Sequence, residues 1–363
     1  MHTRSNHLSS LTGLRFFAAL AVVTYHLRLY ISPLGDSLTL FGYGFTGVSF
    51  FFVLSGFVLT WSGREDVRRG AFYWNRLARI WPLHIFTMML AIWAPQLPTS
   101  SGSGWLAVPF VLSLTQAWIP ASPFLNAFNG VSWSLSCEAF FYLTFPFLCK
   151  KVASAQWRAR AFVTIPAVLL VLAGSLAAVS SVATADYLLG TMPLYRLGEF
   201  ILGMCLAQLM KGGWRPPFHT WHATLLLVTL TVGLFVASLI TNGLAGPVPV
   251  TIANLVMVPG FLALIATCAD GDLSGKTGLL RSSVLVRLGQ WSYALYLVHE
   301  LVIRVARQYS ASLSMGEGFV LAALVVLMSV SLSGLLHEFV EKPAERWLRQ
   351  QYPSRKPQQV QHP

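Results

Sequence analysis

The chain has 363 residues and a formal net charge of +12, yet only 10% of its residues are charged and 55% are hydrophobic. Because soluble domains carry roughly 25% charged residues, this composition and the mean hydropathy of +0.61 exclude an ordinary water-soluble protein. The basic residues stand in short clusters between apolar segments, so the positive charge does not predict nucleic-acid binding, which needs a basic face on a soluble domain.

Apolar segments long enough to cross a bilayer recur along the chain. About 20 apolar residues span the hydrocarbon core, and such segments must be helical because lipid offers no partners to the backbone. We expect an all-α integral membrane protein, a bundle of about ten transmembrane helices, at residues 11–31, 41–61, 83–98, 133–149, 161–183, 188–210, 221–241, 248–268, 288–308 and 317–340. A further apolar stretch, 105–118, is short and predicts a re-entrant or surface-lying segment.

The positions of the basic clusters predict the orientation. With ten spans and a cytoplasmic N-terminus, most of the 25 Lys and Arg residues fall in cytoplasmic segments, and the opposite loops hold none. A crossing at 105–118 would move Lys150 and Lys151 outside, against the positive-inside rule. We therefore expect both termini in the cytoplasm, residues 1–349 as a single transmembrane domain, and residues 350–363, rich in Gln and Pro, as a disordered cytoplasmic tail.

Neither the first apolar segment nor the cysteines indicate a secreted protein. Arg15 interrupts the apolar segment and no small-residue cleavage site follows it, so we expect an uncleaved first span. The four cysteines predict neither a disulfide framework nor a metal site, since all lie in or at the ends of apolar segments: Cys137, Cys149, Cys205 and Cys268.

Arg15 and His26 are the clearest candidate site residues, because ionisable side chains inside a bilayer are costly. Their spacing places them on one face of the first helix, about three turns and about 16 Å apart along its axis. Each also has a plainer interpretation. Arg15 could be an anchor that reaches the cytoplasmic surface, and His26 could be a packing histidine bonded to a neighbouring helix.

Glu138 lies near the start of the fourth predicted span. A carboxylate there needs a partner, and we expect His26, because a carboxylate fixes the tautomer and raises the basicity of an imidazole. Such a pair suits deprotonation of an alcohol; the alternative is a carboxylate that stabilises a helix N-terminus. Arg196 and Glu199 are expected to form an intrahelical ion pair. Weaker candidates for polar contacts inside the bundle are His299, Glu300, His337 and Glu338.

Arg76 and Arg79 stand out in the basic connection between the second and third predicted spans. A spacing of three puts them on one helical face, and guanidinium groups bind phosphate or pyrophosphate through paired hydrogen bonds. A phosphate site is therefore one interpretation. The other is that cytoplasmic connections between spans are generally basic.

Six short motifs follow one another along the chain. The first separates Arg15 and His26 by ten residues, and the others are Phe51-Phe-Val-Leu-Ser-Gly-Phe57, Arg76-Leu-Ala-Arg79-Ile-Trp-Pro82, Trp133-Ser-Leu-Ser-Cys-Glu138, Leu288-Gly-Gln-Trp-Ser-Tyr293-Ala-Leu-Tyr296-Leu-Val-His299 and Val340-Glu-Lys-Pro343. Together they resemble the membrane-bound acyltransferase family 3, which O-acylates bacterial polysaccharides, lipopolysaccharide, peptidoglycan and some macrolides. The resemblance runs from residue 11 to about residue 349, and the family's ten-span plan agrees with the topology predicted from charge.

The resemblance implies roles for five residues. His26 would be the catalytic histidine with Arg15 as its companion, and Glu138 would support the reacting centre. Arg76 and Arg79 would hold the phosphates of a cytoplasmic acyl-CoA, which is the expected acyl donor in place of a bound cofactor. Many members carry an additional C-terminal hydrolase-like domain, which we do not find in this sequence.

We therefore expect an O-acyltransferase of the bacterial inner membrane that moves an acyl group, with acetyl expected, from acetyl-CoA or another acyl-CoA to a hydroxyl of an exopolysaccharide or another lipid-linked surface glycan. Its expected partners are acyl-CoA, the hydroxyl acceptor and membrane lipid. His26, oriented by Glu138, would deprotonate the hydroxyl or carry the acyl group covalently. A macrolide or other secondary metabolite is the alternative acceptor. A proton-coupled transporter using His26, Glu138 and Arg196 is an alternative of another class.

Overall fold

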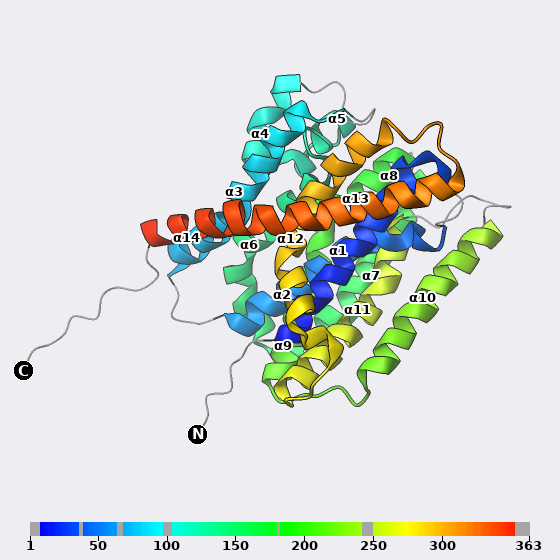
Figure 1. Ribbon diagram of the computed structural model, residues 1–363. Helices are drawn as coiled ribbons and strands as arrows, with labels where there is room; N and C mark the ends of the chain where they lie inside the picture. The colour runs from blue at the N-terminus through cyan, green and yellow to red at the C-terminus, as the bar shows by residue number, and fades with distance from the viewer. Residues whose placement is uncertain are drawn as a thin grey trace, which may run out of the picture.

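The computed structural model describes residues 8–35, 39–63, 68–96, 104–179, 182–241 and 250–352. Within these ranges the regular structure is entirely helical (Figure 1), which confirms the all-α prediction. Each long helix overlaps one predicted apolar segment: α1 (Ser9–Tyr30), α2 (Gly47–Ser62), α3 (Arg69–Trp93), α6 (Trp133–Val152), α7 (Ala155–Val179), α9 (Pro193–Lys211), α10 (Thr220–Thr241), α11 (Val250–Leu273), α12 (Ser283–Arg307) and α13 (Met315–Leu336).

Shorter helices join the long ones. They are η1 (Ser32–Leu34), η2 (Thr39–Thr46), η4 (Gly104–Ala107), α4 (Val108–Leu112), η5 (Gln116–Trp118), α5 (Ser122–Leu125), η6 (Gly130–Ser132), α8 (Val182–Gly190), η7 (Leu279–Arg281), η8 (His337–Glu341) and α14 (Lys342–Gln351). The stretch 105–118 thus forms only short pieces, and α4, with 5 residues, is far below the length of about 20 residues that a crossing needs.

Six helical stretches among the described residues are long and apolar enough to cross a membrane: Ser9–Tyr30, Phe41–Ser62, Ala155–Ser175, Thr220–Ile240, Ile252–Leu273 and Met315–Gln351. Helices α3, α6, α9 and α12 are of similar length but carry more polar and charged residues. The protein is therefore an all-helical, multi-pass membrane protein. Length and composition support six of the ten predicted spans by themselves.

Several helices differ from the predicted bounds. Helix α3 begins at Arg69, well before the predicted residue 83, so Arg76 and Arg79 lie on a helix and not in a loop. The predicted span 188–210 is interrupted, and α9 starts with Pro193, which suits a first helical position because proline lacks the N–H that would go unpaired there.

The last predicted span also continues further than expected. After α13 the chain makes one π-helical turn at His337–Glu341 and runs on as α14, which packs beside the first turns of α3, where Trp74 Nε1 donates to the Leu348 carbonyl over 2.6 Å. Helix α14 ends at Gln351, slightly beyond the predicted domain boundary at residue 349. Most of the predicted disordered tail, residues 353–363, lies outside the described residues.

Glycines set the closest helix contacts in the bundle. A Cβ added to Gly56 of α2 would overlap the carbonyl oxygen of Phe200 in α9, and one added to Gly203 would overlap that of Val53. Small residues allow helix backbones to approach closely where lipid, not water, surrounds the bundle. Helices α2 and α9 therefore form the tightly packed centre. Helix α10 lies at the edge of the bundle in Figure 1, and only 11% of its apolar segment is buried.

Hydrogen bonds tie helix ends together at one end of the bundle. Asp272, at the end of α11, accepts hydrogen bonds from Ser10 Oγ over 2.9 Å and from Arg281 Nε over 2.6 Å. Lys211, at the end of α9, donates to the Thr60 carbonyl over 2.8 Å. We call this the basic end of the bundle, because Lys211 and Arg281 lie there.

The glycine contact between α2 and α9 makes a prediction about stability. Gly56→Ala should lower the free energy of unfolding by about 1–3 kcal/mol, the usual cost of overfilling a packed core, and so lower the melting temperature in detergent. Gly233→Ala in α10 is the control, since nothing lies within 4 Å of a Cβ at that position. Equal melting temperatures for the two variants would contradict this account of the core.

Candidate functional site

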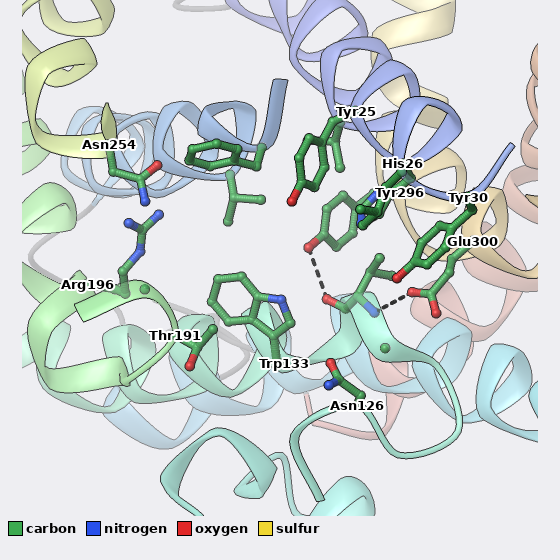
Figure 2. A pocket seen from close by; sticks show the side chains of 17 residues that line it. Tyr25, His26, Tyr30, Asn126, Trp133, Thr191, Arg196, Asn254, Tyr296 and Glu300 are labelled. Carbon is green, nitrogen blue, oxygen red and sulfur yellow. Dashed lines mark hydrogen bonds between the residues drawn. The ribbon is translucent and has the colours of Figure 1, made fainter. Parts of the chain in front are cut away.

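A cavity of about 300 Å³ lies in the half of the bundle away from the basic end, and His26 is part of its wall. We call it the histidine cavity. Its aromatic lining comprises Tyr25, Tyr30, Phe45, Trp133 and Tyr296, and its polar lining comprises His26, Asn126, Thr191, Arg196, Asn254 and Glu300. Figure 2 shows Arg196 and Asn254 on one side of this space and His26 with Glu300 on the other.

The partner of His26 is another histidine. His26 Nδ1 lies 3.0 Å from Nε2 of His299 on α12, and His299 Nδ1 lies 3.1 Å from the carbonyl oxygen of Leu295. His299 is fully buried. The predicted pairing of His26 with Glu138 is therefore wrong, because His26 faces α12 and not α6. The weaker sequence candidate His299 turns out to contact the predicted catalytic residue.

Glu138 belongs to a second, smaller space. It accepts a hydrogen bond of 2.9 Å from the hydroxyl of Tyr142, one turn further along α6, which explains why its carboxylate needs no histidine. Glu138 and Arg15 line a cavity of about 40 Å³ together with Tyr293, here called the Arg15 cavity, and the two charges attract each other. The structure thus brings Arg15 together with Glu138 and places both apart from the imidazole of His26, whereas the family resemblance implied that Arg15 is the companion of His26.

The Arg15 cavity adjoins the histidine cavity. Val48 and Tyr296 line both spaces, so these two residues form part of the wall between them. The face of α1 that carries Arg15 and His26 follows this row, as the spacing of the two residues predicted.

Arg76 lines a third cavity, of about 400 Å³, at the basic end. Tyr73, Trp74, Tyr142 and Tyr352 line it as well; we call it the Arg76 cavity. The Nε of Arg76 is buried and has no hydrogen-bond partner among the described residues. A guanidinium N–H that is left unpaired in a cavity is suited to an anionic or oxygen-rich ligand.

Arg79 has a different environment, although it follows Arg76 by less than one turn of α3. Its charge is attracted by the carboxylates of Glu345, Glu341 and Glu138, from α14, the π-helical turn and α6. Arg79 therefore joins the acidic residues that surround the Arg15 cavity, while Arg76 faces the more open space. Both side chains are half-buried.

The predicted ion pair on α9 is confirmed and forms part of a larger network. Arg196 Nη1 lies 3.0 Å from Glu199 Oε1, and Arg196 Nη2 donates to Ser49 Oγ over 2.9 Å. Ser49 in turn donates to Asn254 Oδ1 over 2.9 Å. The Nε of Arg196 has no hydrogen-bond partner in the part of the chain that the structure describes, although Arg196 lines the histidine cavity.

Glu300 lies on the wall of the histidine cavity opposite Arg196. From the sequence it was only one of the weaker candidates. Its Oε1 lies 2.6 Å from Nη2 of Arg304, and its Oε2 accepts from the backbone N–H of Val131 over 2.8 Å. Arg304 also donates to the Phe128 carbonyl over 2.7 Å. A Cβ at Gly130 would collide with the Glu300 carboxylate, so glycine allows this contact. The signal in the sequence was a carboxylate and an arginine four positions apart inside one predicted span.

No group of three or more His, Cys, Asp or Glu side chains that could hold a metal ion occurs in the described part of the chain. The candidate ligand-binding groups are therefore the arginines, the histidine pair and the polar residues of the three cavities.

This fold and these cavities define a multi-pass membrane protein with a cavity between its helices that is lined in part by a histidine. Comparison with known proteins supplies the chemistry. Residues 8–338 match a family model described as an acyltransferase domain. The chain is 35% identical to the acyltransferase MdmB of Streptomyces mycarofaciens, over 97% of this chain and 95% of MdmB.

Two longer relatives match less closely. The chain is 29% identical to the O-acetyltransferase OatA of Staphylococcus aureus over 39% of this chain and 24% of OatA. It is 27% identical to YrhL of Bacillus subtilis over 94% of this chain and 56% of YrhL. No solved structure matches the chain. The chain belongs to the acyltransferase family 3 and is a membrane O-acyltransferase, which favours an enzyme over the transporter considered from the sequence.

The ion pair of Glu300 and Arg304 makes a prediction about stability. Arg304→Met leaves the buried carboxylate of Glu300 without its counter-charge, and breaking a buried pair in this way costs about 3–5 kcal/mol. Lys342→Met is the control: it breaks a pair with Glu338 whose side chains are 39% and 47% exposed, worth about 1 kcal/mol or less. Melting curves in detergent should separate the two, and a similar small shift for both would show that the buried pair does not stabilise the bundle.

Proposed function

We propose that the protein transfers an acyl group, with acetyl expected, from acyl-CoA at the basic end to a hydroxyl group in the histidine cavity. The observation that carries this proposal is the row of three cavities. The histidine and Arg15 cavities share Val48 and Tyr296, and the Glu138 of the Arg15 cavity bonds to Tyr142 of the Arg76 cavity. Such a row suits a long donor that is charged at one end and reactive at the other.

The donor end of the proposal rests on the arginines. CoA carries its phosphates at the end far from its thioester, and guanidinium groups bind phosphate oxygens with charge-assisted hydrogen bonds. Arg76, with its unpaired Nε, would contact the phosphates directly. Arg79, balanced by Glu341 and Glu345, would add positive charge beside them, and Arg15 with Glu138 would line the way towards His26.

The acceptor end rests on the lining of the histidine cavity. A volume of about 300 Å³ lies at the lower limit of about 300–1,000 Å³ that is usual for ligand sites, so one ring would enter at a time. Trp133 and the tyrosines offer flat apolar surfaces, while Thr191, Arg196 and Asn254 offer polar groups to hydroxyls. A sugar of a bacterial exopolysaccharide or another lipid-linked surface glycan has both kinds of surface.

A second acceptor class fits the same cavity. Five aromatic side chains line it, and this largely apolar surface also favours a hydroxyl of a macrolide or another secondary metabolite. Comparing a surface-glycan fraction with a macrolide as acceptor distinguishes the two classes by which one becomes acylated.

In the proposed reaction, Nε2 of His26 takes the proton of the acceptor hydroxyl. The hydroxyl oxygen then attacks the thioester carbonyl carbon, the C–S bond breaks, and the CoA thiolate takes the proton back from His26. An acyl group carried transiently on His26 would lead to the same products. With the basic end facing the cytoplasm of a bacterial inner membrane and the N- and C-termini on that side, about ten helices would cross the bilayer and CoA would enter from the cytoplasm.

The reaction predicts that His26→Ala abolishes acceptor-dependent release of CoA from acetyl-CoA in membranes, a loss of at least about 100-fold, as expected when a general base is removed. The exposed His222, at the start of α10, gives the matched control His222→Ala, which should keep wild-type activity. Full activity of a correctly inserted His26→Ala protein would rule out both versions of the reaction.

The donor site predicts a separate effect on KM. Arg76→Ala should raise KM for acyl-CoA about tenfold, because a charge-assisted hydrogen bond contributes about 1.5–3 kcal/mol, with little change in kcat at saturation. Arg69→Ala removes the same charge two turns earlier on α3, where the guanidinium lies over the Phe147 ring at 5.7 Å, and should leave KM nearly unchanged. If both variants raise KM equally, the increase reflects the loss of positive charge at this end of α3, and the proposed phosphate site at Arg76 is wrong.

A further inference from the structure

The hydrogen bonds around His299 form a chain that ends at a backbone carbonyl. The carbonyl oxygen of Leu295 lies 3.1 Å from Nδ1 of His299, and Nε2 of His299 lies 3.0 Å from Nδ1 of His26. The chain therefore runs from α12 to α1 through two imidazole rings. Each ring nitrogen in it can be assigned as donor or acceptor from the group at its end.

A carbonyl oxygen can only accept a hydrogen bond, so Nδ1 of His299 must carry the hydrogen. A neutral His299 then has a bare lone pair on Nε2, and this atom must accept a hydrogen bond from Nδ1–H of His26. His26 in turn has its lone pair on Nε2. The backbone carbonyl of Val22, one turn earlier on α1, is a further hydrogen-bond partner of the His26 ring, and His26 lines the histidine cavity.

Neighbouring groups hold this arrangement. His299 and Leu295 are 0% and 1% exposed, so water does not compete for the hydrogen bond between these two residues. The His26 ring stacks on Tyr30 at 5.9 Å and meets Tyr25 edge-on at 5.2 Å, which limits its rotation. Figure 2 shows Tyr296 beside His26 at the cavity wall.

The nearby carboxylate does not take the place of His299. Glu300 is next in the chain, but its two oxygens are occupied by Arg304 and by the N–H of Val131. A neutral imidazole therefore orients His26 where other sites use a carboxylate or a carbonyl. Because His299 is neutral, it orients His26 without placing another charged group inside the bundle, where charges are costly.

We infer that His299 is a positioning residue that holds His26 in the Nδ1–H tautomer and so directs the lone pair of His26 Nε2 into the histidine cavity. The inference rests on the proposed function. When Nε2 takes the proton of the acceptor hydroxyl, His26 becomes an imidazolium whose Nδ1–H still donates to neutral His299. The proton returns from Nε2 to the CoA thiolate, and both rings end the cycle in their starting tautomers.

Two substitutions of His299 test whether the residue at this position must accept a hydrogen bond from Nδ1–H of His26. His299→Leu keeps an apolar side chain in the bundle but offers no acceptor, and it should lower kcat about 100-fold while KM for acyl-CoA stays within about twofold. His299→Gln can present its amide oxygen to His26 Nδ1–H and should recover at least about tenfold of that loss. Equal kcat values for wild type and His299→Leu, or no recovery with His299→Gln in folded protein, would overturn the inference.

His84 provides the matched control. It is also a fully buried histidine bonded to a backbone carbonyl, that of Val111, over 2.9 Å, but it does not line the histidine cavity. Per folded molecule, His84→Leu should keep the wild-type kcat. A loss of kcat as large as that of His299→Leu would assign both effects to packing and overturn the inference.

A measurement on the wild-type protein makes the test independent of variant folding. Nitrogen-15 NMR of histidine-labelled protein in membranes, assigned by comparison with His26→Ala, reports which ring nitrogen of His26 carries the hydrogen. An Nδ1–H tautomer supports the inference, and an Nε2–H tautomer overturns it. Full activity of His26→Ala would instead refute the proposed reaction while leaving this tautomer measurement valid, so the two failures are distinguishable.

Discussion

The scarcity of water inside a membrane bundle is the constraint on which the rest of this structure depends. Every charged side chain placed among the helices needs a partner there, and the partners found are largely local. Arg196 pairs with Glu199 and Arg304 pairs with Glu300, each within one helix. These pairs then use their remaining donors and acceptors to bind other helices, so the groups that are most costly to bury also connect the walls of the histidine cavity.

Close approach of backbones is the second requirement of the site. Just as Gly56 and Gly203 join α2 to α9, a Cβ at Gly289 of α12 would overlap the Thr12 carbonyl of α1. This contact at the basic end brings α1 and α12 together along their length, which is what allows His26 and His299 to meet. The proposed catalytic geometry thus depends on a small buried residue near the basic end of α12.

The arrangement also explains how one helical domain could handle a charged donor and a reaction sensitive to water. In the proposed reaction Arg76 and Arg79 would hold the donor's phosphate groups towards the basic end, and the histidine pair borders a largely aromatic cavity. A site lined largely by apolar side chains strengthens hydrogen bonds to reacting groups. The Arg15 cavity lies between the two, with the balanced charges of Arg15, Arg79, Glu138 and Glu341 around it.

The sequence by itself determined the features that depend on local spacing. Apolar length predicted the long helices, since lipid permits no other regular structure for a single segment; a spacing of three predicted the Arg196–Glu199 pair; and ordered motifs predicted the family. Only the tertiary structure decided which groups meet across helices. The residue that contacts His26 is 273 positions away, and helical periodicity gives the face of a side chain but not the helix that covers it. Glu138 accepts a hydrogen bond from Tyr142, one turn away on the same helix, whereas His26 pairs with His299 on another helix.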